Sequence, residues 1–192
     1  MVEKGTAKRQ GSGSTSTSDN KGHQAKRARK TSEYGRQLEE KQKVKRMYGM
    51  RERQFRKFFA EAARGHEAAG DKLLRLLEQR LDNVVYRLKF AASRIQARQI
   101  VVHGHVTVNG RKVSSPSYLI SIGDEVALAE RIRNRTSFIE AVVEKRMKKA
   151  IKPPEWLELD KDGFRVLVLR DPVLSDIKVP IVEQDIIELY SK

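Results

Sequence analysis

The chain has 192 residues and a formal net charge of +15, from 40 lysines and arginines against 25 aspartates and glutamates. A chain this basic attracts polyanions, so we expect a nucleic acid or an anionic membrane surface as its partner. The sequence contains no cysteine, which excludes disulfides, thiolate metal sites and a cysteine nucleophile. No apolar run approaches the ~20 residues that span a bilayer, and the first thirty residues lack the apolar core of a secretory signal.

The positive charge is concentrated in the first two thirds of the chain. Residues 26–64 carry +9 and residues 65–120 carry +5, whereas residues 151–192 carry −3. We therefore expect the polyanion to lie against the first two thirds. The acidic tail is equally compatible with a protein-contact face and with an ordinary solvated surface.

The first 24 residues are predicted to be a disordered arm. Gly11–Ser18 contains only glycine, serine and threonine, which cannot bury enough apolar surface to offset their conformational entropy. The basic cluster Lys26–Lys30 follows. Such a cluster is typical of an arm that folds against phosphates, and equally of a nuclear-targeting segment.

The segment from Ser32 to Arg64 has apolar residues three and four apart among dense lysines and arginines, which predicts helix. Gly49 in its middle predicts a break or a bend. Base stacking is one interpretation of Phe55, Phe58 and Phe59, but packing of one helix face into a core is the stronger one. The basic residues of the segment are better candidates for phosphate contacts: Lys41, Lys43, Lys45, Arg46, Arg51, Arg53, Arg56 and Lys57.

The leucine-rich stretch Asp71–Phe90 gives the strongest helix prediction, with its first residue in position to cap the helix. Ser93–Gln96 has the form of a capping box, a serine with a glutamine three residues on. It predicts a short helix to about Val102. Gly104 can take the left-handed conformation that ends this helix.

Alternating side chains flank Asn109–Gly110, the pair that best tolerates the backbone of a tight turn, and predict a hairpin over residues 105–113. Ser137–Glu140 has the form of a second capping box, for a helix that runs to about Ala150 and is stopped by Pro153–Pro154. Further strands are predicted at residues 118–122, 125–128, 156–159, 164–169 and 186–190.

Cations on several rigid elements follow one another between residues 80 and 128. Arg94 and Arg98 are four residues apart and so share one face of the short helix. Point cations on rigid elements match phosphates along a folded RNA better than they match a small ligand. We therefore expect recognition of RNA shape and phosphates. The other candidate ligands in this region are Arg80, His103, Asn109, Arg111 and Lys112.

Several segments occur in an order and a spacing that together are specific for one family. The central ones are Gln79–Arg87, Ser93–Gln99 and Val106–Val113. They closely resemble the RNA-binding domain of the S-four family of bacterial small-subunit ribosomal proteins. The similarity covers roughly residues 22–192 and includes Gly22–Gln24, Ser32–Gly35, Glu40–Val44, Glu52–Phe55, Pro154–Leu157 and Glu188–Lys192.

The resemblance implies an α+β fold, a helical domain into which a small RNA-binding domain is inserted. The small domain would hold two helices packed on a short β-sheet, over residues 80–144. The helical domain would comprise residues 25–79 and be completed by residues 145–192, where the end of a helix and short strands pack back on it. Residues 1–24 would remain the disordered arm.

The resemblance also implies a function without catalysis. Such proteins bind small-subunit ribosomal RNA at a multi-helix junction in its 5′ domain, nucleate assembly of the subunit body and contribute to translational accuracy. Their partners include ribosomal protein S-five, through the C-terminal region, and messenger RNA at the channel through which it enters. The location implied is the small ribosomal subunit, in the cytoplasm or in an organelle. Many members bind zinc through a cysteine cluster, which this chain lacks, so we expect no metal and no cofactor.

Four other interpretations are weaker. Arg80–Asp82 is similar to a catalytic element of pseudouridine synthases, but it lies in a predicted helix and no catalytic domain follows. His103 and His105 are more typical of a turn near phosphates than of a metal pair. A free RNA-binding factor that recycles stalled ribosomal subunits would use the same small domain, but it would not need the basic segment 32–64. Membrane-surface binding is disfavoured because the cations are spread over several elements.

Overall fold

The computed structural model describes residues 32–64, 66–144, 153–160, 164–177 and 181–191. The predicted arm, the basic cluster Lys26–Lys30 and the end of the helix predicted to reach Ala150 lie outside these residues. Among the described residues, no helix combines the length and the hydropathy needed to cross a membrane.

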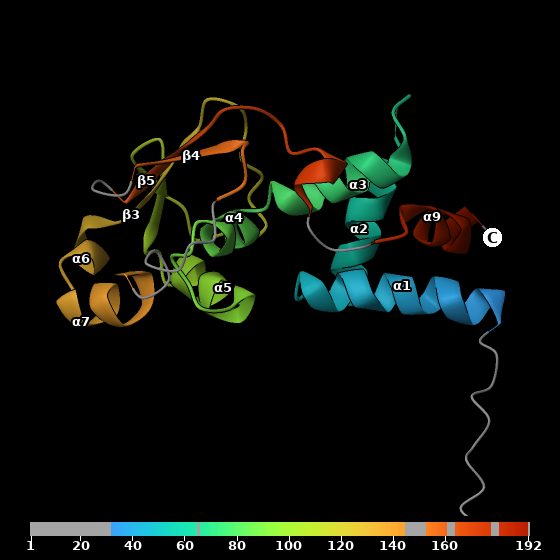
Figure 1. The fold of residues 1–192 in the computed structure, drawn as a ribbon, viewed down its shortest axis with the longest axis horizontal. Coiled ribbons are helices and arrows are strands. Elements are labelled where there is room, and N and C mark those ends of the chain that lie inside the picture. Colours follow the sequence, from blue (N-terminus) through green and yellow to red (C-terminus); the bar gives the residue numbers. More distant parts are fainter. Residues whose placement is uncertain (1–31, 65, 145–152, 161–163, 178–180, 192) are drawn as a thin grey trace, which may run out of the picture. The chain divides into compact units, whose positions relative to one another are not determined.

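Four helices from the two ends of the chain share one apolar core (Figure 1). They are α1 (Glu33–Met47), α2 (Glu52–Ala62), α3 (Ala69–Glu78) and α9 (Glu183–Ser191). Gly49 has a φ of +61° between α1 and α2, so the predicted break is confirmed. Phe55 is fully buried in this core, and Phe58 and Phe59 pack against it, as expected for a helix face rather than a stacking platform.

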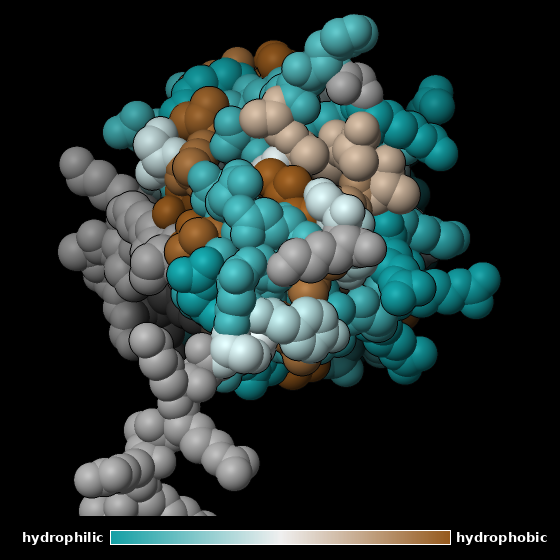
Figure 2. All heavy atoms as spheres, turned by 90° about the vertical axis from the view of Figure 1, so that its right-hand side faces the viewer, coloured by the Kyte–Doolittle hydropathy of each residue, from teal (hydrophilic) through white to brown (hydrophobic). Residues whose placement is uncertain are grey.

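The C-terminal helix α9 lies against α1 and α3. The sequence predicted a strand at residues 186–190, which is wrong. Ile186 is buried and Tyr190 half-buried, four residues apart on one helical face, and the Tyr190 ring stacks on Phe59 with 4.3 Å between the ring centroids. Figure 2 views this side and shows apolar patches among hydrophilic side chains.

The predicted long leucine helix is two helices, α3 and α4 (Leu81–Arg87). Between them Arg80 has an extended backbone, with φ −63° and ψ 133°. The amide of Leu81 donates to the Tyr118 carbonyl at 2.8 Å instead of continuing the helix. The predicted capping role of Asp71 is also wrong, because Ala68 is the N-cap residue and Asp71 lies in the first turn.

The short helix and the hairpin are confirmed. Helix α5 (Arg94–Val102) begins at Ser93, whose hydroxyl accepts a hydrogen bond from the amide of Gln96 at 3.2 Å, and it is followed by Gly104 with a φ of +69°. Strands β1 (Val106–Val108) and β2 (Arg111–Lys112) are joined by Asn109 and Gly110, both with positive φ.

Five antiparallel strands form one sheet in the order β2-β1-β3-β5-β4. The added strands are β3 (Glu125–Leu128), β4 (Leu157–Asp160) and β5 (Arg165–Val168). One face of the sheet forms a second core with α4 and α5, burying for example Val108, Val126 and Val166. The fold class is thus α+β, with helices and an antiparallel sheet. We expected the strands after residue 145 to pack on the helical segment, but β5 instead pairs with β3.

Two local predictions in the second half of the chain are wrong. Residues 118–122 form no strand, only an isolated bridge between Leu119 and Arg80. Ser137 is not a helix cap, because it lies inside α7 (Thr136–Phe138), which continues into the π-helix η1 (Ile139–Glu144). The remaining short elements are α6 (Glu130–Arg133) and the 3-10 turn η2 (Leu174–Asp176).

Candidate nucleic-acid interface

Three lysines of α1 are engaged within the fold. Lys41 and Lys45 each donate to the Glu52 carboxylate at 3.0 Å, and their side chains are only 12% and 18% exposed. Lys43 pairs with Glu40 at 3.1 Å. A phosphate would have to compete with these carboxylates for the same ammonium groups.

The Glu52 carboxylate is the centre of this cluster. Burial alone would raise its pKa, but hydrogen bonds from Lys45, Lys41 and Tyr190 lower it to about 2. Tyr190 comes from α9, so the cluster joins α1, α2 and the C-terminal helix. Its lysines therefore hold the helical core together.

The arginines around the α1–α2 junction are more accessible. Arg46, Arg51, Arg53 and Arg56 are all exposed. Arg56 is 4.0 Å from Glu52 with its side chain 72% exposed, and Arg46 donates to the Gln42 carbonyl. Exposed guanidinium groups with weak partners are free to turn toward phosphates.

Arg80 is fully buried. Its guanidinium donates two hydrogen bonds to Asp82, at 3.0 and 2.7 Å, and lies 5.3 Å from the centroid of the Phe58 ring. A side chain with no exposed surface can offer nothing to a ligand. Arg80 and Asp82 are the charged residues of the motif that is similar to a catalytic element. They are thus paired with each other.

Arg94 and Arg98 project from successive turns of α5, as the spacing predicted. Arg94 is half-buried, with its guanidinium carbon 4.5 Å from the centroid of the Tyr86 ring and 5.1 Å from that of Tyr48. Arg98 is 37% exposed and 3.8 Å from Asp82. Burial and the neighbouring Arg87 lower the pKa of Arg94 from its ordinary value.

A cluster of cations surrounds His105, at the start of β1. Burial lowers the pKa of this histidine, and the charges of His103, Arg135, Arg131 and Lys112 lower it further. The structure therefore brings the predicted His103 and Lys112 together with two arginines that sequence reasoning missed. The alternating run Arg131, Arg133 and Arg135 was the available signal.

Gly104 lies directly under the side chain of Lys112. A Cβ at this position would collide with the lysine stem and lie 2.7 Å from its Nζ atom. The positive φ is what favours glycine here, because L side chains rarely adopt this conformation, whereas the flexible end of the lysine can move aside.

The polar side chains of the hairpin have two different roles. Arg111 is exposed on β2, whereas both ends of the Asn109 side-chain amide are engaged. The amide donates to Asp124 at 2.7 Å and accepts from the amide of Glu125 at 2.9 Å. Asn109 therefore fastens the turn to β3.

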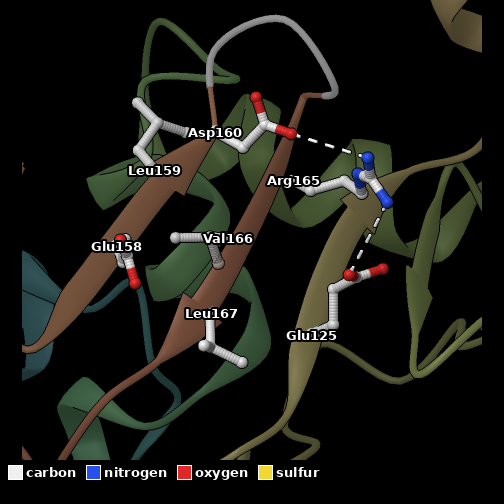
Figure 3. Close-up of a pocket in the computed structure, with 7 residues that line it drawn as sticks. All are labelled: Glu125, Glu158, Leu159, Asp160, Arg165, Val166 and Leu167. Carbon is white, nitrogen blue, oxygen red and sulfur yellow. Dashed lines mark ion pairs between the residues drawn. The ribbon is translucent and has the colours of Figure 1, made fainter.

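The exposed face of β3, β5 and β4 has the opposite electrostatic character. Figure 3 shows a groove there, in which Arg165 lies between Asp160 at 3.6 Å and Glu125 at 3.8 Å. Glu158 adds a third carboxylate. This face repels phosphates, so the candidate nucleic-acid interface lies on the elements with exposed cations.

Among the described residues, no three histidine, aspartate or glutamate side chains come together as a metal site. Accessible cations of the described residues include those on α1, α2, α5, β2 and α6. Fixed cations on several rigid elements suit a polyanion whose phosphates are held in a folded shape.

Comparison with known proteins agrees with this chemistry. Residues 4–78 match the model of the ribosomal protein S4/S9 N-terminal domain, and residues 79–126 match that of the S4 domain. Similar proteins include the small ribosomal subunit protein uS4 of Trichlorobacter lovleyi, 53% identical over 85% of this chain and 77% of the relative. Those of Caldicellulosiruptor bescii and Thermus thermophilus are both 50% identical, over 89% and 88% of this chain and 81% and 80% of their own.

These matches cover most of the chain at an identity that leaves no doubt about common ancestry. The family is not enzymatic, and its S4 domain binds ribosomal RNA. The chain therefore belongs to the uS4 family, the RNA-binding structural proteins of the small ribosomal subunit.

Proposed function

We propose that this protein is a primary binder of small-subunit ribosomal RNA, which docks on a multi-helix junction in the 5′ domain and nucleates assembly of the subunit body. The observation that carries the proposal is the set of accessible cations held by separate rigid elements: Arg94 and Arg98 on α5, Arg111 and Lys112 on β2. A junction gathers phosphates from several helices into one fixed pattern, which such a set fits better than a single charged helix would.

The proposal extends to the exposed arginines at the α1–α2 junction. Arg46, Arg51, Arg53 and Arg56 would reach a second part of the same RNA. Lys41, Lys43 and Lys45 would add to the local positive potential from their internal ion pairs. In this view Arg80 and Asn109 support the interface through the fold alone, since one is buried and the other is engaged at both ends of its amide.

We further propose that the C-terminal region contacts ribosomal protein S-five and that this contact contributes to translational accuracy, close to where messenger RNA enters. The supporting observations are the net negative charge of residues 151–192 and the exposed apolar side chain of Val182, 49% exposed just before α9. An acidic surface with apolar patches suits a protein partner better than it suits RNA.

Binding to a transcript of the 5′ domain of bacterial small-subunit ribosomal RNA tests the main proposal. The logarithm of affinity should fall linearly with the logarithm of salt concentration, by roughly 0.7–0.9 per phosphate released. Charge reversal of Arg111→Glu with Lys112→Glu should weaken binding and lower that slope. The matched control is Glu158→Lys with Asp160→Lys on β4, at the other edge of the sheet from β2.

Equal losses from the two pairs, or a slope near zero for the unaltered protein, would contradict the proposed interface. The alternative of a free recycling factor predicts a protein that leaves small subunits in a high-salt wash. An assembled ribosomal protein should instead sediment with them.

A further inference from the structure

The Arg94 guanidinium lies against two aromatic rings from two parts of the fold. Tyr86 belongs to α4, within the sheet-bearing part, whereas Tyr48 ends α1 in the helical part. Its Nε atom donates to the side-chain oxygen of Asn83 at 3.1 Å. The described residues give its two terminal nitrogens no hydrogen-bond partner, so a bidentate anion can take them.

Tyr48 and Asn83, one of the rings and the amide that hold Arg94, are themselves held by one carboxylate. Glu78 is 1% exposed at the end of α3 and accepts four hydrogen bonds from three side chains. The Tyr48 hydroxyl donates to it at 2.6 Å, the Asn83 amide at 2.9 Å, and Arg87 donates two bonds at 3.0 and 2.6 Å.

Asn83 transmits the influence of this carboxylate to Arg94. Because its amide nitrogen donates to Glu78, its oxygen is turned toward the Nε atom of Arg94. The bonds to Tyr48 and Asn83 therefore fix one ring and the side chain that, within the described part of the chain, accepts a hydrogen bond from the guanidinium. Arg87 neutralises the carboxylate, and its charge repels that of Arg94.

We propose that Glu78 is a positioning residue for RNA binding: through Tyr48 and Asn83 it fixes the Arg94 guanidinium in the orientation in which its terminal nitrogens grip one phosphate. The inference rests on the proposed function. It makes a buried acid necessary for the binding of a polyanion. Simple charge counting predicts the reverse, since removing a negative charge from a basic protein should tighten its hold on RNA.

The test compares variants on the same 5′-domain transcript. Glu78→Gln should weaken binding by about tenfold, the loss of roughly one well-placed charge-assisted contact. Tyr48→Phe keeps both rings and every charge, and should weaken binding in the same direction but less. The control Glu130→Gln removes an exposed acid from α6 and should leave affinity unchanged or slightly tighter.

A second set of variants carries Arg94→Ala as well. If Glu78 acts through Arg94, neither Glu78→Gln nor Tyr48→Phe should weaken binding further in this background. The salt slope of each double variant should equal that of Arg94→Ala alone. A merely structural role would instead give losses that add to those of Arg94→Ala.

Thermal melting separates folding from positioning. Glu78→Gln leaves Arg87 without its buried counter-ion, and if this variant is unfolded at the assay temperature, the Tyr48→Phe pair decides the question. Additive losses, or a folded Glu78→Gln protein that binds as tightly as the unaltered one, would overturn the inference. Salt-independent binding by the unaltered protein would overturn the proposed function instead, so the two failures are distinguishable.

Discussion

At the residue scale, arginine side chains have three roles, and the extent of burial determines which role each one has. Arg80 is inside and neutralises Asp82, Arg94 is half-buried between two rings, and Arg111 is exposed. A buried guanidinium needs a carboxylate to compensate for its lost hydration, but an exposed one often has such a neighbour too. Residue type and spacing therefore place all three in one candidate set, and only the surrounding fold separates them.

The pKa of Glu52 predicts how the free energy of unfolding depends on pH. Its pKa of about 2 in the folded state lies below the ordinary value of 4.5, so its charge favours folding above that ordinary value. This stabilisation is lost as the pH falls from 4.5 toward 2. Chemical denaturation at about pH 5 and about pH 3 should show a larger loss of unfolding free energy for the unaltered protein than for Glu52→Gln. Parallel losses would mean that Lys41 and Lys45 do not stabilise this carboxylate.

At the scale of elements, sequence predictions succeed where the signal that sets the backbone is local. Ser93 caps α5 with its own hydroxyl, Gly49 separates α1 from α2, and Asn109–Gly110 turns the hairpin. Each of these residues acts on backbone within three positions of itself. No knowledge of distant contacts is needed to interpret them.

The predictions fail where a distant segment decides. Leucines continue at helical spacing past residue 80, but the amides of Leu81 and Asp82 bind carbonyls at Tyr118 and Pro116 and end the helix. Residues 186–190 are a short apolar run, which periodicity alone cannot assign. They are helical because they pack against α1, which lies far from them in the sequence.

The hairpin turn separates two contributions of Asn109. Asn109→Gly keeps a residue that tolerates the φ of +50° and loses the bonds to Asp124 and Glu125. Asn109→Ala loses both the bonds and the conformational tolerance, so it should destabilise the protein by about 1 kcal/mol more. Urea denaturation of the two variants measures this difference. A glycine variant less stable than the alanine variant would show that backbone conformation is not what selects Asn109.

At the scale of the whole molecule, two apolar cores stabilise the fold. One is built by α1, α2, α3 and α9, and the other by the sheet with α4 and α5. The resemblance of the sequence to a known family predicted the helical part and the inserted sheet. It did not predict that β4 and β5 would complete that sheet, because β5 pairs with β3, about 40 residues upstream, and β4 joins the sheet only through β5.

The first core depends on the last helix. Ile186 is 1% exposed, so Ile186→Asp would bury an unpaired charge and should destabilise the protein by about 3–5 kcal/mol. In a domain of this size that lowers the melting temperature by roughly 10 °C. Gln184→Asp, on the exposed side of the same helix, is the control: it loses only an exposed hydrogen bond to Glu188 and should lower the melting temperature far less. Similar melting of both variants would mean that α9 is not part of the cooperative unit.

Helix α9 also determines when the nascent chain can complete its folding. The ribosome synthesises α1 long before α9. Asp185 of α9 binds Arg36 of α1 from 149 positions later in the chain, and Glu188 binds Gln37 from 151 positions later. Until α9 has been synthesised, the side of α1 that packs on it stays uncovered, although the arginines of α1 have already left the ribosome. The nascent chain can therefore meet nucleic acid before its own interior is buried, and the arrival of α9 becomes the step that completes the helical core.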